Sequence, residues 1–392
     1  MKFSMDRDYL VKTLQEMVQI DSVNPELSPG GAGEQEMAEY MIQQMRGLGL
    51  ETNSYELEPK YWNAVGVLKG TGGGKSLMLT GHMDTVGVGD MADPFSGEIR
   101  GGRLFGRGSC DMKCGLTAVL GAVKALKDAG MRVAGDIYVA GAADEEYLSK
   151  GSEQLAQAYQ VDGVIVAEPS GFYLVRAHKG FIWFEVNVFG KAAHGSDYEG
   201  GVDAITRMGR FLVAFEKLAE AQQNSQADPL LGPPSLHASL IGGGIELSTY
   251  PPSCTVKVEW RTIPGQTEEA LRGMLEGIID ALKVQDPTFE AEIKTLFVRH
   301  PFQVPEDAPI VQSVYRQAEK VLGKAPEFAG MGGWADTSLF ERAGMDALMF
   351  GPKGEGAHAE EEWADLDSMV DAAKVFAEVI LDFCGPVEKE IS

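Results

Sequence analysis

Four short apolar stretches each run directly into acidic or histidine residues, and this pattern constrains the fold more than any other feature. The stretches and the residues that follow them are 76–81 with His82-Met83-Asp84, 136–143 with Asp144-Glu145-Glu146, 162–167 with Glu168, and 347–350 with a glycine-rich loop that carries His358. Apolar runs of this length are typical of buried strands in an α/β sheet. Ligands of such sheets bind beyond the carboxyl ends of the strands. The sequence therefore predicts a cluster of histidines and acids at one edge of a sheet.

The first of these strand ends has a spacing that suits a metal ligand. Only one residue separates His82 from Asp84, so alternation along an extended chain turns both side chains to the same side. One ring nitrogen of His82 can bind a metal ion while the other donates to Asp84, which fixes the tautomer of the ring. A capped turn is the alternative interpretation of an isolated His-x-Asp. The acids after the neighbouring strands, and Asp111 in the glycine-rich turn 106–113, favour a metal site.

The residues at these strand ends resemble those of a known enzyme family. It is the di-zinc peptidase and deacylase family of acetylornithine deacetylase, succinyl-diaminopimelate desuccinylase, aminoacylase and glutamate carboxypeptidase. The matching blocks, in the family's order, are Gly-His-Met-Asp-Thr-Val from Gly81, Gly-Arg-Gly-Ser-Cys-Asp-Met-Lys from Gly106, Asp-Glu-Glu from Asp144, Glu-Pro-Ser from Glu168, Gly-Lys-Ala-Ala-His-Gly-Ser from Gly190 and Gly-Ala-His from Gly356. An ordered set that spans most of the chain is far more specific than any single motif.

The resemblance implies two zinc ions per chain, with cobalt or manganese able to substitute. His82, Asp111 and Glu168 would hold one ion. Asp111, Glu146 and His358 would hold the other, so that Asp111 bridges the pair. Elementary chemistry agrees, because two cations about 3.5–4 Å apart need a shared anionic ligand to offset their repulsion. Zinc also accepts both imidazole and carboxylate ligands, and a catalytic zinc keeps one position open.

Three residues are expected to serve catalysis: Glu145, His194 and Asp84. The resemblance implies that Glu145 is the general base, and adjacent glutamates point different ways, so that Glu146 can bind metal while Glu145 takes a proton from water. Asp84 would orient the ring of His82. His194 lies in the turn Ala-Ala-His-Gly-Ser. In the family the matching histidine reaches an active site, often that of the partner subunit, and stabilises the tetrahedral oxyanion; a solvated turn histidine is the alternative.

Substrate recognition is expected to involve Arg261, near the end of a predicted strand. Its guanidinium could clamp the α-carboxylate of the substrate through two hydrogen bonds, and a surface ion pair is the alternative. Two nearby segments depart from the family. Residues 248–251 read Ser-Thr-Tyr-Pro where many relatives carry Asn-x-x-Pro, and residues 333–336 read Gly-Trp-Ala-Asp in place of Gly-x-Thr-Asp. These departures leave substrate specificity open.

The pattern of predicted elements indicates one domain interrupted by another. Residues 1–177 and 299–392 follow an α/β pattern, and the resemblance implies a zinc-peptidase-like catalytic domain whose mixed central sheet is flanked by helices. Residues 178–298 are expected to form a smaller α+β domain, ferredoxin-like in its βαββαβ order, that serves as a lid or dimerisation domain. Its predicted strands are 181–189, 236–241, 254–262 and 291–298, and its predicted helices are 202–218 and 267–282.

The charge balance excludes several kinds of partner. The chain has 392 residues with 34 Lys and Arg against 58 Asp and Glu, a formal net charge of −24. Such a balance argues against nucleic acid and against anionic membrane surfaces. No apolar run approaches the roughly 20 residues of a membrane span, and the first residues lack an apolar core of signal-peptide length. Four cysteines in a chain of this length form no disulfide framework, so we expect a cytoplasmic protein.

Two features near the expected ligands have simpler interpretations. Cys110 and Cys114 flank Asp111 and could supply thiolate ligands, but their spacing is not that of a zinc ribbon and other residues fill the sites, so we interpret them as structural thiols. Cys114 stands where the family usually has glycine. The acidic run 360–362 after His358 is most simply a solvated loop.

The expected function is therefore that of a co-catalytic di-zinc hydrolase that cleaves the amide bond of an N-acyl-L-amino acid and works as a homodimer. The alternative is a dipeptidase or a glutamate-carboxypeptidase-like enzyme, which uses the same residues on a short peptide. A non-catalytic binding protein is a more remote alternative, because it would have lost the base or a ligand, and Glu145 and the five ligand positions are all present.

Overall fold

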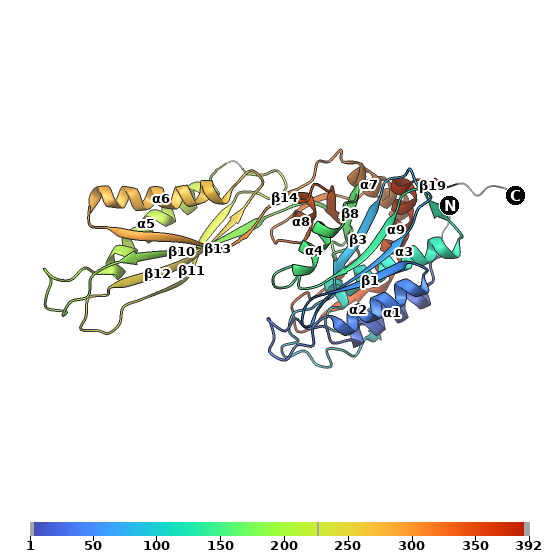
Figure 1. Ribbon diagram of the computed structural model, residues 1–392, viewed down its shortest axis with the longest axis horizontal. Coiled ribbons are helices and arrows are strands. Elements are labelled where there is room, and N and C mark those ends of the chain that lie inside the picture. Colours follow the sequence, from blue (N-terminus) through green and yellow to red (C-terminus); the bar gives the residue numbers. More distant parts are fainter. Residues whose placement is uncertain (1–3, 226, 388–392) are drawn as a thin grey trace. The chain divides into compact units, whose positions relative to one another are not determined.

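The computed structural model describes residues 4–225 and 227–387, which form two compact units (Figure 1). The first unit contains the chain up to Arg176, Val304–Ala329 and the chain from Ala335 onward. The second contains Ala177–Gln303 and Gly330–Trp334. The second unit thus consists of two segments, one long and one short, that interrupt the sequence of the first. None of the described helices is both long and apolar enough to cross a membrane.

A large mixed sheet forms the centre of the first unit, with strands in the order β1-β2-β7-β3-β8-β16-β9. Their bounds are β1 Glu51–Glu58, β2 Tyr61–Leu68, β7 Ile137–Ala142, β3 Leu77–His82, β8 Gly163–Val166, β16 Ala347–Met349 and β9 Leu174–His178. Two short strands, β14 (Phe302–Gln303) and β15 (Phe328–Met331), also pair with β9. The four strands β7, β3, β8 and β16 are parallel. β3 is buried at every position, as expected for a parallel strand covered on both faces.

Helices flank this sheet. Their bounds are α1 Arg7–Gln19, α2 Gln35–Gly47, α3 Cys114–Asp128, α4 Lys150–Ala158, α7 Pro309–Leu322, α8 Thr337–Arg342 and α9 Leu366–Cys384. Asp6 caps the N-terminus of α1 and Asp365 that of α9, and each aspartate side chain accepts a backbone N–H of the first turn, which satisfies a group that the helix itself leaves unpaired. α3 and α9 pack against each other and against β3. Both helices are apolar along most of their length because they lie in the core.

A second, smaller sheet in the first unit carries one of the predicted ligands. Its strands run in the order β17-β18-β5-β4, with bounds β17 Gly354–Glu355, β18 Trp363–Asp365, β5 Arg103–Phe105 and β4 Glu98–Arg100. His358 lies in the loop between β17 and β18, and β5 leads into the turn η1 (Ser109–Lys113) that contains Asp111. The pairing of β18 with β5 therefore brings these two loops together. A separate pair joins β6 (Arg132–Val133) to β19 (Pro386–Val387).

The second unit is an antiparallel sheet with two helices packed on one face. The strands run in the order β11-β12-β10-β13, with bounds β11 Ser235–Gly243, β12 Ser253–Thr262, β10 Gly180–Phe189 and β13 Glu290–Arg299, and the helices are α5 Ala204–Gln223 and α6 Glu268–Gln285. Alternate residues of β10, such as Phe184 and Val186, join Phe211 of α5 and Leu275 of α6 in one core. The sequence order is βαββαβ, as predicted. The predicted fold class, a mixed α/β domain with an inserted α+β domain, is confirmed.

Candidate metal centre

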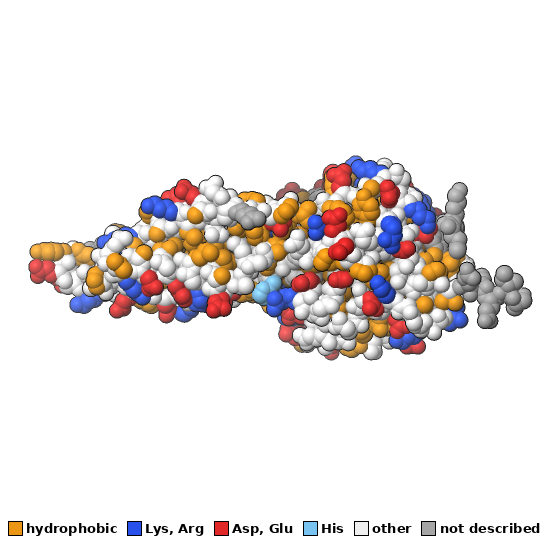
Figure 2. Space-filling view, turned by 90° about the horizontal axis from the view of Figure 1, so that it is seen from above, with side chains coloured by type: hydrophobic (Ala, Val, Ile, Leu, Met, Phe, Trp, Pro, Cys, Tyr) orange, Lys and Arg blue, Asp and Glu red, His pale blue; other side chains and the backbone are white. Residues whose placement is uncertain are grey.

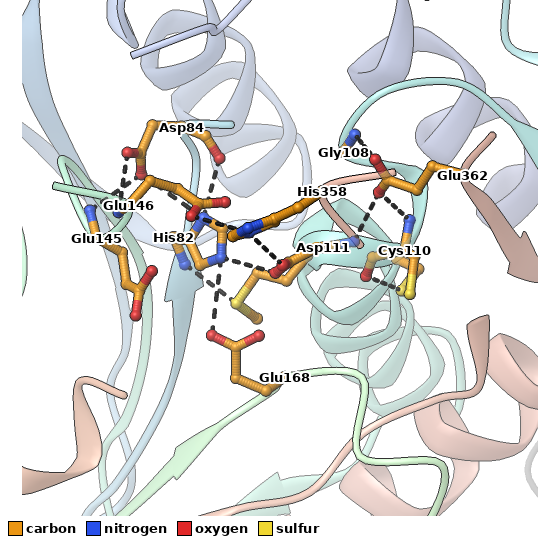
Figure 3. Close-up of polar contacts among 12 residues, drawn as sticks. His82, Asp84, Gly108, Cys110, Asp111, Glu145, Glu146, Glu168, His358 and Glu362 are labelled. Atoms are coloured by element: carbon orange, nitrogen blue, oxygen red, sulfur yellow. Dashed lines mark hydrogen bonds and ion pairs between the residues drawn. The ribbon is translucent and has the colours of Figure 1, made fainter. Parts of the chain in front are cut away.

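Five predicted ligands and the predicted base lie together at the carboxyl ends of the parallel strands (Figure 3). His82 is the last residue of β3, Glu145 and Glu146 follow β7, and Glu168 follows β8. These three strands are parallel neighbours, so their carboxyl ends meet at one edge of the sheet. The remaining two ligands lie in segments next to the small sheet. Asp111 is in η1, which follows β5, and His358 is in the loop between β17 and β18.

Asp111 lies between the two histidines. Its Oδ1 is 3.0 Å from Nε2 of His82, and its Oδ2 is 3.5 Å from Nε2 of His358. Nε2 of His82 is also 3.7 Å from a carboxylate oxygen of Glu168, and Nε2 of His358 is 3.1 Å from a carboxylate oxygen of Glu146. Ligand atoms of His82, Asp111 and Glu146 all lie within 4.8 Å of one another, close enough for a single metal ion, although the predicted sets place His82 and Glu146 on different ions. Each oxygen of Asp111 therefore faces a different histidine, and each histidine also lies near a different glutamate.

The ring of His82 is oriented through the backbone of Asp84. Its Nδ1 is 2.9 Å from the carbonyl oxygen of Asp84 and 3.6 Å from the carboxylate. A carbonyl oxygen can only accept, so Nδ1 carries a proton and Nε2 faces the acids of the cluster. The sequence led us to expect that the ring would donate to the side chain of Asp84. That carboxylate does lie 3.6 Å from Nδ1, but it also accepts backbone N–H groups of Glu145 and Glu146, at 3.1 and 3.2 Å.

The charges of the cluster suit a bound cation. Within the described part of the chain, Asp111, Glu146 and Glu168 make no ion pair with lysine or arginine, and their ionic partners are His82 and His358. Hydrogen bonds to Asp111 and Glu146 raise the pKa of His358 to about 10. Burial raises the pKa of Glu168 to about 8. Carboxylates this crowded and buried need compensating positive charge, and this mixture of imidazole and carboxylate groups is one that zinc-like divalent ions accept.

The two adjacent glutamates have different surroundings. The side chain of Glu146 extends toward His358, whereas the side chain of Glu145 points another way (Figure 3). Burial raises the pKa of Glu145 well above its usual value, although the nearby His82 opposes this shift. Glu145 is thus a carboxyl group that holds a proton more readily than an exposed glutamate. It lies beside the candidate ligands, and among the described residues its side chain forms no ion pair.

Two buried polar residues near the centre were not expected from the sequence. Asn24 donates through Nδ2 to the carboxylates of Asp84 and Asp144, both at 2.9 Å. Glu362 is 1% exposed and accepts backbone N–H groups of Cys110 and Asp111. The interpretation of residues 360–362 as a solvated loop is therefore wrong for the third acid, because β18 begins beside it and turns it toward η1. Nothing in a run of three identical acids distinguishes the buried one.

The two cysteines beside Asp111 are structural. Both are buried, and Sγ of Cys114 lies 3.1 Å from the carbonyl oxygen of Cys110. Burial raises the pKa of both thiols, as is usual for cysteines that pack in a core. The candidate ligand group in the described residues contains no cysteine.

His194 and Arg261 belong to the second unit, and their predicted roles stay predictions. His194 is exposed, and its Nδ1 lies 2.8 Å from Oγ of Ser196. Arg261 donates through Nε to Glu259 at 2.7 Å, and its guanidinium carbon lies 4.9 Å from the centre of the Phe181 ring. Glu259 is the one ion-pair partner of Arg261 among the described residues, so the terminal nitrogens of the guanidinium are not engaged in another ion pair.

Known proteins are similar to this chain in sequence and in structure. Residues 78–382 match peptidase family M20/M25/M40. An acetylornithine deacetylase from Myxococcus xanthus is 33% identical over 335 residues, which are 82% of this chain and 84% of that protein. Aminopeptidase PepT from Bacillus cereus has a TM-score of 0.80 at 20% identity, covering 97% of this chain and 99% of that one. A dinuclear metal-binding peptidase of the M20 family from Bacillus subtilis has a TM-score of 0.74 at 14% identity, covering 97% and 99%.

The sequence match covers most of the chain and contains every strand end that carries a candidate ligand. The structural matches extend over nearly the whole chain and confirm the fold. The family resemblance predicted from the ordered motifs is thereby confirmed, and with it the binding of divalent metal. The chain belongs to peptidase family M20/M25/M40 and is a metal-dependent amide hydrolase.

Proposed function

We propose that this hydrolase carries a pair of zinc ions and cleaves the amide bond of an N-acyl-L-amino acid. The observation that carries the proposal is the two-sided position of Asp111, whose two carboxylate oxygens face Nε2 of His82 and Nε2 of His358. A carboxylate so placed suits a bridging ligand. The similarity to an acetylornithine deacetylase supports the substrate class.

The proposed ligands divide into two sets that share one acid. His82, Asp111 and Glu168 would hold one ion, and Asp111, Glu146 and His358 the other, with cobalt or manganese able to replace zinc. When bound, such ions polarise the amide carbonyl and lower the pKa of water at the site. The closeness of the nitrogen and oxygen atoms across both sets, between 3.0 and 3.7 Å, supports the assignment.

Glu145 is the proposed general base. It takes a proton from the attacking water and gives this proton to the leaving amine. The burial that raises the pKa of Glu145 suits a group that must return a proton as well as accept one. Asp84 supports this role, because its carboxylate accepts the backbone N–H groups of Glu145 and Glu146. These bonds fix the position of the proposed base relative to the proposed ligand.

Two residues of the second unit are proposed to act on the substrate. His194 would donate to the oxyanion that forms at the attacked carbonyl. Arg261 would bind the α-carboxylate through the terminal nitrogens of its guanidinium, while Glu259 holds its Nε. Residues 178–298 would accordingly form a lid over a small-molecule substrate.

The same domain is proposed to form a homodimer. β11 is one of the two edge strands of its sheet, and an edge strand presents unpaired N–H and C=O groups that a second copy can satisfy. Leu240 and Ile241 of β11 are 65% and 60% exposed, and Ile245 and Leu247 beyond it are 73% and 106% exposed. Hydrophobic side chains reach the surface of this unit in the space-filling view (Figure 2). Pairing through β11 would cover these side chains.

A hydrolysis screen tests the substrate class. Purified enzyme would be assayed with N-acetyl and N-succinyl amino acids and with dipeptides. The N-acyl amino acids are expected to have the highest kcat/KM. The alternative function, a dipeptidase or glutamate-carboxypeptidase-like enzyme, would replace the proposal if peptides were cleaved faster than every N-acyl amino acid.

A further inference from the structure

The loop that carries His358 is fastened to the turn that carries Asp111 by one buried acid. His358 lies between β17 and β18 and has a positive φ of 63°. Glu362 follows in the same loop, directly before β18, and is 1% exposed. Burial of a carboxylate is costly unless its oxygens find donors. The partners of Glu362 therefore indicate why an acid is placed there.

The carboxylate of Glu362 accepts four hydrogen bonds, all from the segment that leads to Asp111. Oε2 accepts from Nη1 of Arg107 at 2.7 Å and from the backbone N–H of Gly108 at 3.0 Å. Oε1 accepts from the backbone N–H groups of Cys110 and Asp111, both at 2.9 Å. These bonds satisfy both oxygens of the carboxylate. Charge-assisted bonds to buried N–H groups are among the stronger polar contacts in proteins.

Arg107 and the backbone complete the connection between the two loops. Nη2 of Arg107 donates to the carbonyl oxygen of Ala359 at 2.9 Å, next to His358. The backbone N–H of Gly106 donates to the carbonyl oxygen of Glu362 at 3.1 Å. Arg107 is itself 3% exposed, so its ion pair with Glu362 is shielded from water. The loop of His358 is thus joined to the segment before Asp111 at two places, at Ala359 beside His358 and at Glu362 beside β18.

We propose that Glu362 is a positioning residue that sets the separation of Asp111 and His358 and thereby the affinity of the metal site that these two side chains share. The inference rests on the proposed ligand assignment and deepens it. Glu362 does not touch the candidate ligand atoms, because its bonds end on Arg107 and on backbone N–H groups. It acts through the backbone of η1, because its carboxylate accepts the backbone N–H of Asp111.

Substitution by glutamine tests the charge and the acceptor oxygens of Glu362 while the shape of the side chain is kept. Glu362→Gln keeps the size but replaces one oxygen with an NH2 group, which would face two donors that it cannot satisfy. These donors are either Nη1 of Arg107 and the N–H of Gly108, or the N–H groups of Cys110 and Asp111, and they could recover partners only if the segment 107–111 moved. Loss of an outer partner of a metal ligand typically weakens metal binding by about 10–100-fold.

A cobalt titration tests the inference without relying on activity. Metal-free wild type, Glu362→Gln and a control, Glu378→Gln, would be titrated with Co²⁺, followed by visible absorption and by competition with a chelator. Glu378 is a matched control because it is also buried, at 8% exposed, and pairs with Lys320 at 2.8 Å. Glu362→Gln is expected to bind one Co²⁺ about 10–100-fold more weakly with an altered spectrum. Glu378→Gln should bind Co²⁺ as wild type does.

The outcomes separate this inference from the proposed function. Wild-type affinity and an unchanged cobalt spectrum in Glu362→Gln would overturn the positioning role. If wild type bound a single Co²⁺, the di-metal proposal would fail, and the role of Glu362 would be judged on the affinity for that one ion. Should Glu362→Gln not fold, Arg107→Lys replaces it, since lysine keeps the charge but cannot reach both Glu362 and Ala359. Cobalt affinity equal to wild type in Arg107→Lys would then overturn the inference.

Discussion

The backbone N–H of Glu145 donates to the carboxylate of Asp84 over 3.1 Å. The bond ties the loop after β7 to the end of β3. The same carboxylate accepts from the N–H of Glu146 and from Nδ2 of Asn24. One buried aspartate thus fixes the backbone of both the proposed base and a proposed ligand.

Replacing Asp84 should therefore disturb catalysis, although Asp84 is not itself a proposed metal ligand. In Asp84→Asn one of the two oxygens becomes an NH2 group, so that a backbone N–H of the loop loses its acceptor. We expect hydrolysis to fall by about 10–100-fold, measured as kcat at saturating substrate. Asp136→Asn is the control, because Asp136 also accepts a backbone N–H, that of Gly70 at 2.9 Å, but precedes β7. An Asp84→Asn enzyme with wild-type kcat would contradict this role.

The two adjacent glutamates should give opposite phenotypes. Glu145→Gln keeps its shape but cannot accept a proton, so hydrolysis should fall by at least about 10²–10⁴-fold with metal retained. Glu146→Gln should instead reduce metal content, because glutamine is a poorer ligand than a carboxylate. Steady-state kinetics and elemental analysis of the same preparations make the comparison. Reversed results would mean that the roles of base and ligand are exchanged.

Removing one histidine should weaken one metal site more than the other. Wild type is expected to bind roughly two divalent ions per chain, and chelation should abolish hydrolysis. His82→Ala and His358→Ala each remove a ligand from a different set, so each should lower the metal content. His237→Ala serves as the control, since His237 is exposed on β11 in the second unit. An active wild-type preparation without bound zinc, cobalt or manganese would refute the di-metal assignment.

Mixing two inactive variants tests whether His194 acts across a dimer. Chains with Glu145→Gln and chains with His194→Ala would be mixed under conditions of subunit exchange. A shared site predicts partial recovery of hydrolysis, because a mixed dimer contains one site with both residues intact. A monomer whose His194 serves its own chain predicts no recovery. Chains shown to exchange subunits and still inactive would exclude action across the dimer.

The buried carboxyl group of Glu34 should make stability depend on pH. Burial, together with Asp84 and Asp144 nearby, raises its pKa from 4.5 to about 9. Oε2 of Glu34 has no hydrogen-bond partner among the described residues. The folded chain therefore binds a proton that the unfolded chain releases between these two pKa values, so the free energy of unfolding falls as pH rises through that window.

Glu34→Gln removes this titration. The variant should gain stability relative to wild type by up to about 1.4 kcal/mol per pH unit as pH rises from about 5 to about 9. Urea unfolding of metal-free protein at several pH values measures the difference. Glu36→Gln, an exposed substitution in α2, controls for the amide itself. A constant difference between Glu34→Gln and wild type across the window would show that Glu34 does not titrate as described.

The elements of the fold could be predicted from local patterns. The helix predicted over 267–282 is observed as Glu268–Gln285, and the strand predicted over 181–189 is observed as Gly180–Phe189. Such patterns are reliable because burial imposes a period of two on a half-covered strand and of about 3.6 on a helix. The grouping of His82, Glu146 and Glu168 was likewise predictable, since parallel neighbouring strands end at the same edge of a sheet.

Only the tertiary structure decided which polar groups hold this cluster in place. Glu360, Glu361 and Glu362 are identical in sequence, yet the third alone is buried, because β18 pairs with β5 and turns it onto the N–H groups of η1. The carboxylate of Asp84 was expected at the ring of His82 and lies 3.6 Å from it, but its hydrogen bonds with the backbone of Glu145 and Glu146 appear only in the structure. A hydrogen bond depends on the distance and direction between groups far apart in the chain, and no local period of the sequence encodes either quantity.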